Sequence, residues 1–191
     1  MFHWLNSIDT SLFLFLNGKH NAFWDVVMYW SSNKLTWLPV YLLLIYLVVK
    51  HYRRQSWIVI LFVALLITLT DQISVQLFKE IFHRLRPCHQ PALEGLVHLV
   101  RGKCGGDYGF ISSHACNYFG IALFLIGMLG KRVRYFIPLI LFWAVWISYS
   151  RIYLGVHFPG DVLTGGLVGA LIGYLLARAC KWALGRAKKS L

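Results

Sequence analysis

The sequence predicts an all-α fold: a polytopic membrane helical bundle with about five to six transmembrane helices, built from a single domain of residues 1–191. Hydrophobic residues make up 58% of the chain and charged residues only 14%, and the mean hydropathy is +0.60. This composition excludes an ordinary soluble domain. Several apolar runs approach the roughly 18 residues that predict a membrane helix, and little chain lies between them.

Five hydrophobic runs occupy residues 34–180, the predicted transmembrane core. Tryptophan, tyrosine and basic residues flank these runs, as interfacial anchors of membrane helices do. The runs are Leu35–Val49, Trp57–Thr70 with an extension towards Phe78, His114–Leu129, Tyr135–Tyr149 and Val162–Ala179. We therefore expect five full spans.

Residues 1–33 contain an apolar run that polar residues interrupt. Ile8–Leu16 is apolar, but residues 17–21 and Asp25 break any continuation to Trp30. This pattern predicts interfacial or poorly spanning helices, with a kinked or tilted sixth span as the alternative. No cleavable signal peptide is expected, because Met1–Asn17 lacks a basic start and a small-residue cleavage site.

Basic residues in three segments set the predicted orientation. The positive-inside rule makes these segments cytoplasmic, including the basic tail of residues 181–191 and hence the C-terminus. The residues are Lys50, His51, Arg53 and Arg54, then Lys131, Arg132 and Arg134, then Lys181, Arg186, Lys188 and Lys189. The formal charge of +12 also fits anionic membrane lipids. No nucleic-acid partner is expected, because that would require a basic face on a soluble fold.

This orientation places residues 79–110 and 151–160 outside, so that three polar clusters fall on the same, extracytoplasmic face. In the first cluster polar residues recur at steps of four and three: Gln72, Gln76, Lys79, His83 and Arg86. We expect them on one face of a helix that Pro87 ends, turned towards a cavity. The alternative is that Lys79 and Arg86 reach out to lipid headgroups. The role of Asp71, deeper in the run, is open.

The second and third clusters lie where two further helices are expected to begin. Ser112 suits an N-cap, so Ser113 and His114 fall in a first helical turn, where free amide groups favour a phosphate. Arg151 ends the fourth run. His157 follows in a short loop, and Pro159 suits the first turn of the last helix.

Asp161 falls within reach of His157 if that loop folds back. A carboxylate bonded to one imidazole nitrogen would leave the other free to attack. The structural alternatives are a capping Asp161 with an interfacial His157, and a His114 that only forms hydrogen bonds.

The cysteines and glycines add structural expectations. Cys88 and Cys104 share the predicted outer loop, where a disulfide could persist; the alternative is two free thiols. Cys116 and Cys180 lie in predicted spans as small apolar side chains. No histidine and cysteine spacing suggests zinc, so neither a metal nor a cofactor is expected. A stripe of Gly165, Gly169 and Gly173 predicts close packing against another helix of the bundle, with a dimer face as the alternative.

Taken in order, the clusters resemble the type 2 phosphatidic acid phosphatase family. The pattern is Lys79, six residues, Arg86-Pro87; Ser112-x-His114; and Ser150-Arg151, five residues, His157, three residues, Asp161. The similarity covers roughly residues 57–180. It implies a helical core similar to that of the vanadium-dependent haloperoxidases.

The resemblance also implies a role for each site residue. His157 attacks phosphorus and becomes a phosphohistidine, Asp161 orients it, and His114 protonates the leaving oxygen. The phosphoryl oxygens are bound by Lys79, Arg86, Arg151, the Ser112 hydroxyl and the Ser113 amide. No metal is needed.

The middle motif departs from the family pattern. The family has Pro-Ser-Gly-His where this chain has Ile111-Ser112-Ser113-His114. Loss of the glycine adds a side chain beside the phosphate, and Ser113 could donate its own hydroxyl. No charged or nucleophilic group is lost, so activity is expected while substrate preference stays open.

These observations predict an integral membrane hydrolase acting on a lipid phosphate or diphosphate at the extracytoplasmic face of the cytoplasmic membrane. The expected partner is an amphiphilic phospholipid or polyprenyl phosphate, and the resemblance places undecaprenyl diphosphate first. Phosphatidylglycerol phosphate, phosphatidic acid and lipid A phosphate are the alternatives. A non-enzymatic anion-binding or transport protein would use the same cations, and a vanadate-dependent oxidant enzyme is a further alternative. The oligomeric state stays open.

Overall fold

The computed structural model describes residues 3–189, and among these residues it contains helices but no strand. The predicted all-α fold is confirmed. The α-helices are α1 His3–Asn17, α2 Ala22–Ser32, α3 Leu38–Tyr52, α4 Ser56–Gln72, α5 Glu80–Phe82, α6 Ser113–Leu129, α7 Phe136–Tyr153 and α8 Pro159–Lys189. A π-helix, η3 Ile73–Lys79, joins α4 to α5. The last two residues of the predicted basic tail, 190–191, lie outside the described residues.

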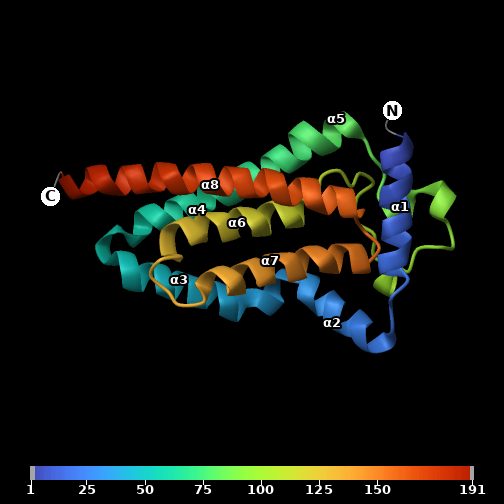
Figure 1. The fold of residues 1–191 in the computed structure, drawn as a ribbon, viewed down its shortest axis with the longest axis horizontal. Helices are drawn as coiled ribbons and strands as arrows, with labels where there is room; N and C mark the ends of the chain where they lie inside the picture. The colour runs from blue at the N-terminus through green and yellow to red at the C-terminus, as the bar shows by residue number, and fades with distance from the viewer. Residues whose placement is uncertain (1–2, 190–191) are drawn as a thin grey trace.

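Short 3₁₀ helices occupy the connections. They are η1 Lys34–Trp37, η2 Arg53–Gln55, η4 Pro87–His89, η5 Pro91–Leu93 and η6 Val100–Gly102. The last three lie in the loop between α5 and α6, which meets one end of the bundle (Figure 1). This loop and the α7–α8 connection carry much of the site described below.

Five apolar helices, α3, α4, α6, α7 and α8, run along the long axis of the molecule (Figure 1). Within residues 3–189, three stretches are long and apolar enough to cross a membrane: Lys34–Phe82, Phe136–Tyr153 and Pro159–Ala187. The first of these reverses at Arg53, where φ is 46°, so it contains both α3 and α4. The shorter helix α6 is also apolar. The five predicted runs therefore correspond to these five helices.

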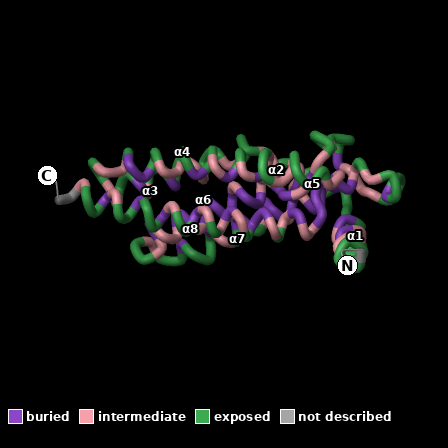
Figure 2. Tube along the Cα trace, turned by 90° about the horizontal axis from the view of Figure 1, so that it is seen from above, coloured by how far each residue is buried: buried purple, intermediate pink, exposed green. Residues whose placement is uncertain are grey.

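The outside of the bundle exposes large apolar side chains, whereas the buried residues line its interior (Figure 2). Leu139, Leu163 and Leu167 are 66%, 66% and 64% exposed. A soluble protein rarely leaves so extensive an apolar surface in water, whereas lipid tails solvate it. The surface is that of a membrane protein.

Helices α6 and α8 form the most extensive helix pair in the described chain. The glycine stripe of α8 faces α6. A Cβ on Gly165 would lie 2.6 Å from the Ser112 carbonyl oxygen, and one on Gly169 would collide with the carbonyl of Cys116. The predicted packing of the stripe against a helix of the same bundle is therefore confirmed.

Gly169→Ala should destabilise the protein strongly, because the added methyl group meets backbone that cannot rotate away. We expect a loss of about 3 kcal/mol or more, at or above the upper end for overpacked cores. Thermal unfolding in detergent measures it. The matched control is Gly185→Ala on the same helix, where nothing lies within 4 Å of an added Cβ. Equal melting temperatures for the two variants would contradict the prediction.

The N-terminal residues form two separate short helices. α1 lies across the end of the bundle rather than along it (Figure 1). Asn17, predicted only as an interruption, is buried and anchors the chain: its Nδ2 donates to the Tyr153 carbonyl at 2.8 Å and to the His98 carbonyl at 3.0 Å. Neither α1 nor α2 has the length of a span. That residues 1–33 lie in the membrane interface stays a prediction.

The expectation of one helix reaching Pro87 is wrong. Helix α5 ends at Phe82, and His83 adopts a left-handed conformation with φ 46°. The chain then runs extended, with the Arg86 N–H donating to the Asp107 carbonyl at 3.0 Å and the Gly109 N–H to the Arg84 carbonyl at 2.8 Å. His83 and Arg86 are therefore not on one helical face with Lys79. The π-helix shifts the register, and pairing with residues 107–109 replaces helical hydrogen bonds.

Candidate active site

A cavity of about 570 Å³ opens among α3, α4 and α6 and reaches the loop before α8. Six of the predicted site residues line it: Lys79, Arg86, Ser113, His114, Arg151 and His157. The other two, Ser112 and Asp161, are completely buried and are not among the lining residues. The fold thus gathers the three sequence clusters around one space.

His157 and Asp161 form a close pair at this cavity. His157 Nδ1 lies 3.5 Å from Asp161 Oδ2, and the two side chains are 2% and 0% exposed. Among the described residues this nitrogen makes no hydrogen bond, so a modest movement would bring it into bonding distance, as often happens when a substrate binds. The pair lies on a short turn because Pro159 begins α8 and the Leu154 N–H caps the end of α7.

The pKa of His157 is lowered well below 6.5. Burial is the largest cause, and the cations Arg86, Arg151 and Lys79 add to it. The imidazole is consequently neutral at neutral pH. A neutral imidazole has the free lone pair that nucleophilic attack requires.

The start of α6 is capped as predicted. Ser112 Oγ accepts a hydrogen bond from the Ala115 N–H at 3.4 Å, and the Ser112 N–H donates to the Asp161 carbonyl at 3.0 Å. These bonds tie the second cluster to the third. Since the Ser112 hydroxyl is buried and engaged in capping, its predicted contact with a phosphate stays a prediction.

Ser113, one of the two residues that depart from the family pattern, is bonded to a site cation. Lys79 Nζ donates to Ser113 Oγ at 2.9 Å, and Ser74 Oγ lies 2.8 Å from the same oxygen. The added hydroxyl therefore holds the lysine at the cavity.

Backbone carbonyls and a neighbouring hydroxyl orient the two arginines. Arg86 Nε donates to the Tyr108 carbonyl at 3.3 Å and Nη1 to the Cys104 carbonyl at 3.2 Å. Arg151 Nη1 donates to Ser32 Oγ. Arg151 Nε is buried and has no hydrogen-bond partner among the described residues. An anion in the cavity would supply one, because buried donors are rarely left unpaired.

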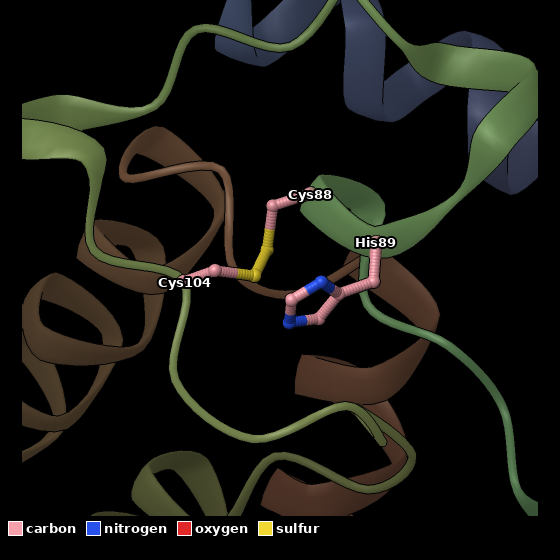
Figure 3. Close-up of side chains that lie close together, drawn as sticks. All are labelled: Cys88, His89 and Cys104. Carbon is pink, nitrogen blue, oxygen red and sulfur yellow. A yellow bond between two sulfur atoms is a disulfide. The ribbon is translucent and has the colours of Figure 1, made fainter.

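Cys88 and Cys104 are joined by a disulfide, with their Cα atoms 6.0 Å apart (Figure 3). His89 lies beside it, and potential ligand atoms of these three residues lie within 4.8 Å of one another. Sulfur atoms bonded to each other are not thiolates, the form that binds zinc. The oxidised loop therefore does not offer a zinc site here.

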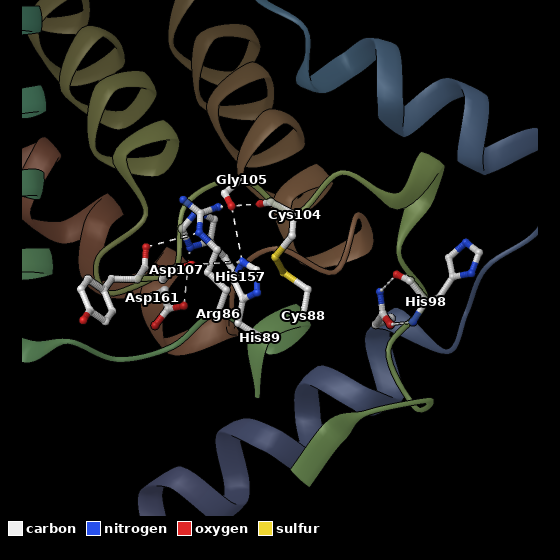
Figure 4. The surroundings of a disulfide bond; sticks show 11 residues. Arg86, Cys88, His89, His98, Cys104, Gly105, Asp107, His157 and Asp161 are labelled. Carbon is white, nitrogen blue, oxygen red and sulfur yellow. Dashed lines mark hydrogen bonds and ion pairs between the residues drawn. A yellow bond between two sulfur atoms is a disulfide. The ribbon is translucent and has the colours of Figure 1, made fainter. Parts of the chain in front are cut away.

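The disulfide lies close to the site. Cys88 follows Arg86 by two residues, and Cys104 supplies a carbonyl to that arginine (Figure 4). Replacing both cysteines by serine should lower the free energy of unfolding by about 3 kcal/mol, as loop closure predicts, and raise KM because Arg86 loses support. Thermal unfolding and kinetics with and without reductant measure these effects. Reductant should affect the unmodified protein and leave the double variant unchanged; an equal response of both would contradict the prediction.

The structure adds residues that the sequence did not single out as site residues. Lys34, Asn117 and Tyr118 line the cavity, as does Asp71, whose role was open. Arg84 bonds Asp161, with Nη1 2.7 Å from Oδ1. One feature of the sequence could have pointed to Arg84. In an extended segment residues two apart share a face, so Arg84 would share a face with Arg86. This relation was missed because the segment was expected to be helical.

Comparison with known proteins gives one family. The PAP2 superfamily model matches residues 57–184. A lipid A 4'-phosphatase of Bacteroides thetaiotaomicron is 39% identical over 92% of this chain and 78% of its own length. A lipid A 4'-phosphatase of Porphyromonas gingivalis is 34% identical over 94% of this chain and 75% of its own length. The crystal structure of a transmembrane PAP2-type phosphatidylglycerolphosphate phosphatase from Bacillus subtilis has the same fold, with a TM-score of 0.67, 24% identity, and coverage of 95% of this chain and 88% of the other.

Proposed function

The chain belongs to the PAP2 superfamily and is a lipid phosphatase, and from this premise we propose that it removes the 4'-phosphate of lipid A through a phosphohistidine at His157. The observation that carries the proposal is that two histidines, four cations and an apolar interior share one cavity. The reaction divides into attack by His157 and hydrolysis of the phosphoenzyme.

In the first step His157 attacks phosphorus through the ring nitrogen that does not face Asp161. A bond from nitrogen to phosphorus forms, and the bond from phosphorus to the lipid oxygen breaks. His114 donates a proton to that oxygen. A bound phosphate brings negative charge beside His114, which favours the protonated imidazole that this step needs.

In the second step water attacks the phosphohistidine and releases inorganic phosphate, with His114 accepting a proton from the water. Asp161 stabilises the positive charge on His157 while the intermediate exists. Lys79, Arg86 and Arg151 hold the phosphoryl oxygens in both steps. Such fixed cations favour phosphoryl transfer by positioning and by neutralising charge in a water-poor site. We propose that no metal takes part.

The rest of the cavity suits a lipid tail. Aliphatic side chains of three helices line it beyond the phosphate-binding residues: Leu44 and Val48 on α3, Val59, Val63 and Ile67 on α4, and Ile121 and Leu125 on α6. Burial of methylene groups there contributes about 0.8 kcal/mol for each one. A cavity with a phosphate-binding end and an apolar remainder fits a substrate that has both a phosphate and an acyl chain.

The order of substrates differs from the one that the sequence suggested. Undecaprenyl diphosphate ranked first there, whereas two relatives at 39% and 34% identity are named as lipid A 4'-phosphatases. We therefore place lipid A first and keep phosphatidylglycerol phosphate, phosphatidic acid and undecaprenyl diphosphate as alternatives.

The site is proposed to face away from the cytoplasm. The basic segments, which the positive-inside rule assigns to the cytoplasm, lie where α3 meets α4, between α6 and α7 and at the end of α8, and none of them contains a site residue. An introduced Cys at exposed Leu96 that a membrane-impermeant label reaches only from the cytoplasm would contradict this orientation.

A direct comparison of substrates tests the proposal. The purified protein in detergent is incubated with each of the four lipids, and released phosphate is measured. We expect the fastest release from lipid A, with mass spectrometry showing loss of the 4'-phosphate and not the 1-phosphate. Chelators should not change the rate. Faster release from another lipid would reassign the substrate, and no release from any of them would favour the non-enzymatic alternative.

A further inference from the structure

Arg84 joins the N-terminal helix α1 to Asp161. Its Nη1 lies 2.7 Å from Asp161 Oδ1, and its Nη2 lies 2.7 Å from Asp9 Oδ2. Nη2 also donates to Asn6 Oδ1 at 3.1 Å. Two acidic side chains 152 positions apart in the sequence (161 − 9) thus share one guanidinium.

Asp9 binds the α7–α8 connection as well as Arg84. Its Oδ1 accepts a hydrogen bond from the Gly160 N–H at 2.7 Å, one residue before Asp161. A Cβ on Gly160 would lie 2.7 Å from Asp9 Oδ2, so the close approach depends on glycine. Asp9 therefore fixes both the guanidinium and the backbone on which Asp161 is carried.

Aromatic side chains packed against the Arg84 guanidinium support the same arrangement of Arg84 and α1. The Arg84 guanidinium lies over the Phe158 ring, 4.3 Å from its centroid. The Phe158 ring meets Phe13 of α1 edge to face, with centroids 5.3 Å apart. Both phenylalanines are buried. The chain around His157 is thus held between α1 and Arg84.

Asp161 needs such a partner. It is completely buried, and a buried carboxylate is costly unless it is paired and hydrogen-bonded. Arg84 takes Oδ1, and the Phe158 N–H donates to Oδ2 at 2.9 Å. These two bonds turn Oδ2 towards His157 Nδ1, 3.5 Å away.

We propose that Asp9 and Arg84 are positioning residues of the phosphatase, which hold Asp161 ionised and oriented and so align His157 for attack. The inference rests on the proposed function, since it assigns to these residues an effect on the same reaction. Helix α1 is then part of the catalytic apparatus. Its attachment does not depend on this pair, because Asn17 and Phe13 anchor it separately.

Steady-state kinetics of Arg84→Gln and Asp9→Asn test the inference, with the lipid that the unmodified protein hydrolyses fastest among the four above. We expect kcat to fall by about 10²-fold for Arg84→Gln and about 10-fold for Asp9→Asn, the range seen when residues that orient a reacting group are lost. KM should change by less than about threefold, because neither residue lines the phosphate cavity. Arg84→Lys should restore kcat to within about tenfold of the unmodified value, because it keeps the charge.

The double variant and a matched control separate positioning from general loosening. Since Asp9 acts through Arg84, the double variant should be no slower than Arg84→Gln alone. The control is Asp25→Asn on α2, which removes the negative charge from the group bonded to His98 Nε2 at 2.9 Å and Tyr153 Oη at 2.8 Å but touches no site residue. Its kcat should be unchanged.

The possible failures are distinguishable. Normal kcat in Arg84→Gln and Asp9→Asn, with an active unmodified protein, overturns the inference alone. An equal loss of kcat in Asp25→Asn also overturns the inference. The same holds if the loss of kcat in Arg84→Gln and Asp9→Asn only matches their loss of folded protein, measured by gel filtration. An unmodified protein that releases no phosphate overturns the proposed function and the inference with it.

Discussion

Replacing His157 by glutamine should reduce phosphate release by about 10⁴-fold or more, the scale on which hydrolases lose activity without their nucleophile. Glutamine keeps a polar side chain of similar reach but cannot form the phosphorus–nitrogen bond. The folded protein should remain intact, because glutamine fills much of the space of the buried imidazole, and gel filtration checks this. Phosphate release and trapping of an acid-labile phosphoprotein with labelled substrate measure the effect.

The matched control is His51→Gln. This histidine bonds the Leu47 carbonyl through Nδ1 at 2.8 Å within α3 and does not itself line the cavity, so its replacement should leave turnover unchanged. Near-normal turnover of His157→Gln would refute the assignment of the nucleophile. A phosphoprotein that persists in this variant would do the same.

The second large effect is expected for Arg151→Gln, with a fall in kcat/KM of about 10³-fold. The magnitude is that of a cation that neutralises charge in phosphoryl transfer. Its Nη1 is held by Ser32, while the buried Nε has no partner among the described residues. We expect the phosphoryl group to supply the missing acceptor, because buried donors are rarely left unpaired. Inhibition by orthovanadate, a phosphate analogue, should weaken in the variant as well.

The control for Arg151 is Arg101→Gln. Arg101 lies outside the membrane spans, with its guanidinium 3.9 Å from the centroid of the Tyr29 ring, and does not line the cavity. The loss of its charge tests whether removing a cation outside the cavity also lowers kcat/KM. Comparable losses in both variants would mean that overall positive charge, rather than Arg151, supports the reaction.

Local patterns in the sequence were sufficient for much of the fold. The five apolar runs became α3, α4, α6, α7 and α8, Ser112 caps α6, and Pro159 begins α8. Each of these features depends on residues within a few positions of one another. The same locality explains the error after Lys79, because a spacing of three and four residues does not reveal a left-handed residue at His83.

The candidate site was predictable in its residue types but not in its connections. Lys79, His114 and His157 could be identified from spacing and family pattern, and the fold brings them to one cavity. Ser112 caps α6 as expected, and its contact with a phosphate stays a prediction. Arg84 and Asp9 were missed because the partner of each is at least 75 positions away in the sequence.

The sequence by itself determined the membrane setting, the helices and the residues that we propose to carry the chemistry, because hydrophobic runs, caps and motifs act over short distances along the chain. Only the tertiary structure decided how these residues are held. The close approach of α6 and α8 at the glycine stripe brings the Ser112 N–H to the Asp161 carbonyl. The crossing of α1 over the bundle end brings Asp9 to Arg84. Both contacts join residues far apart in the chain, and the pairing of a buried charge depends on the complete packing around it.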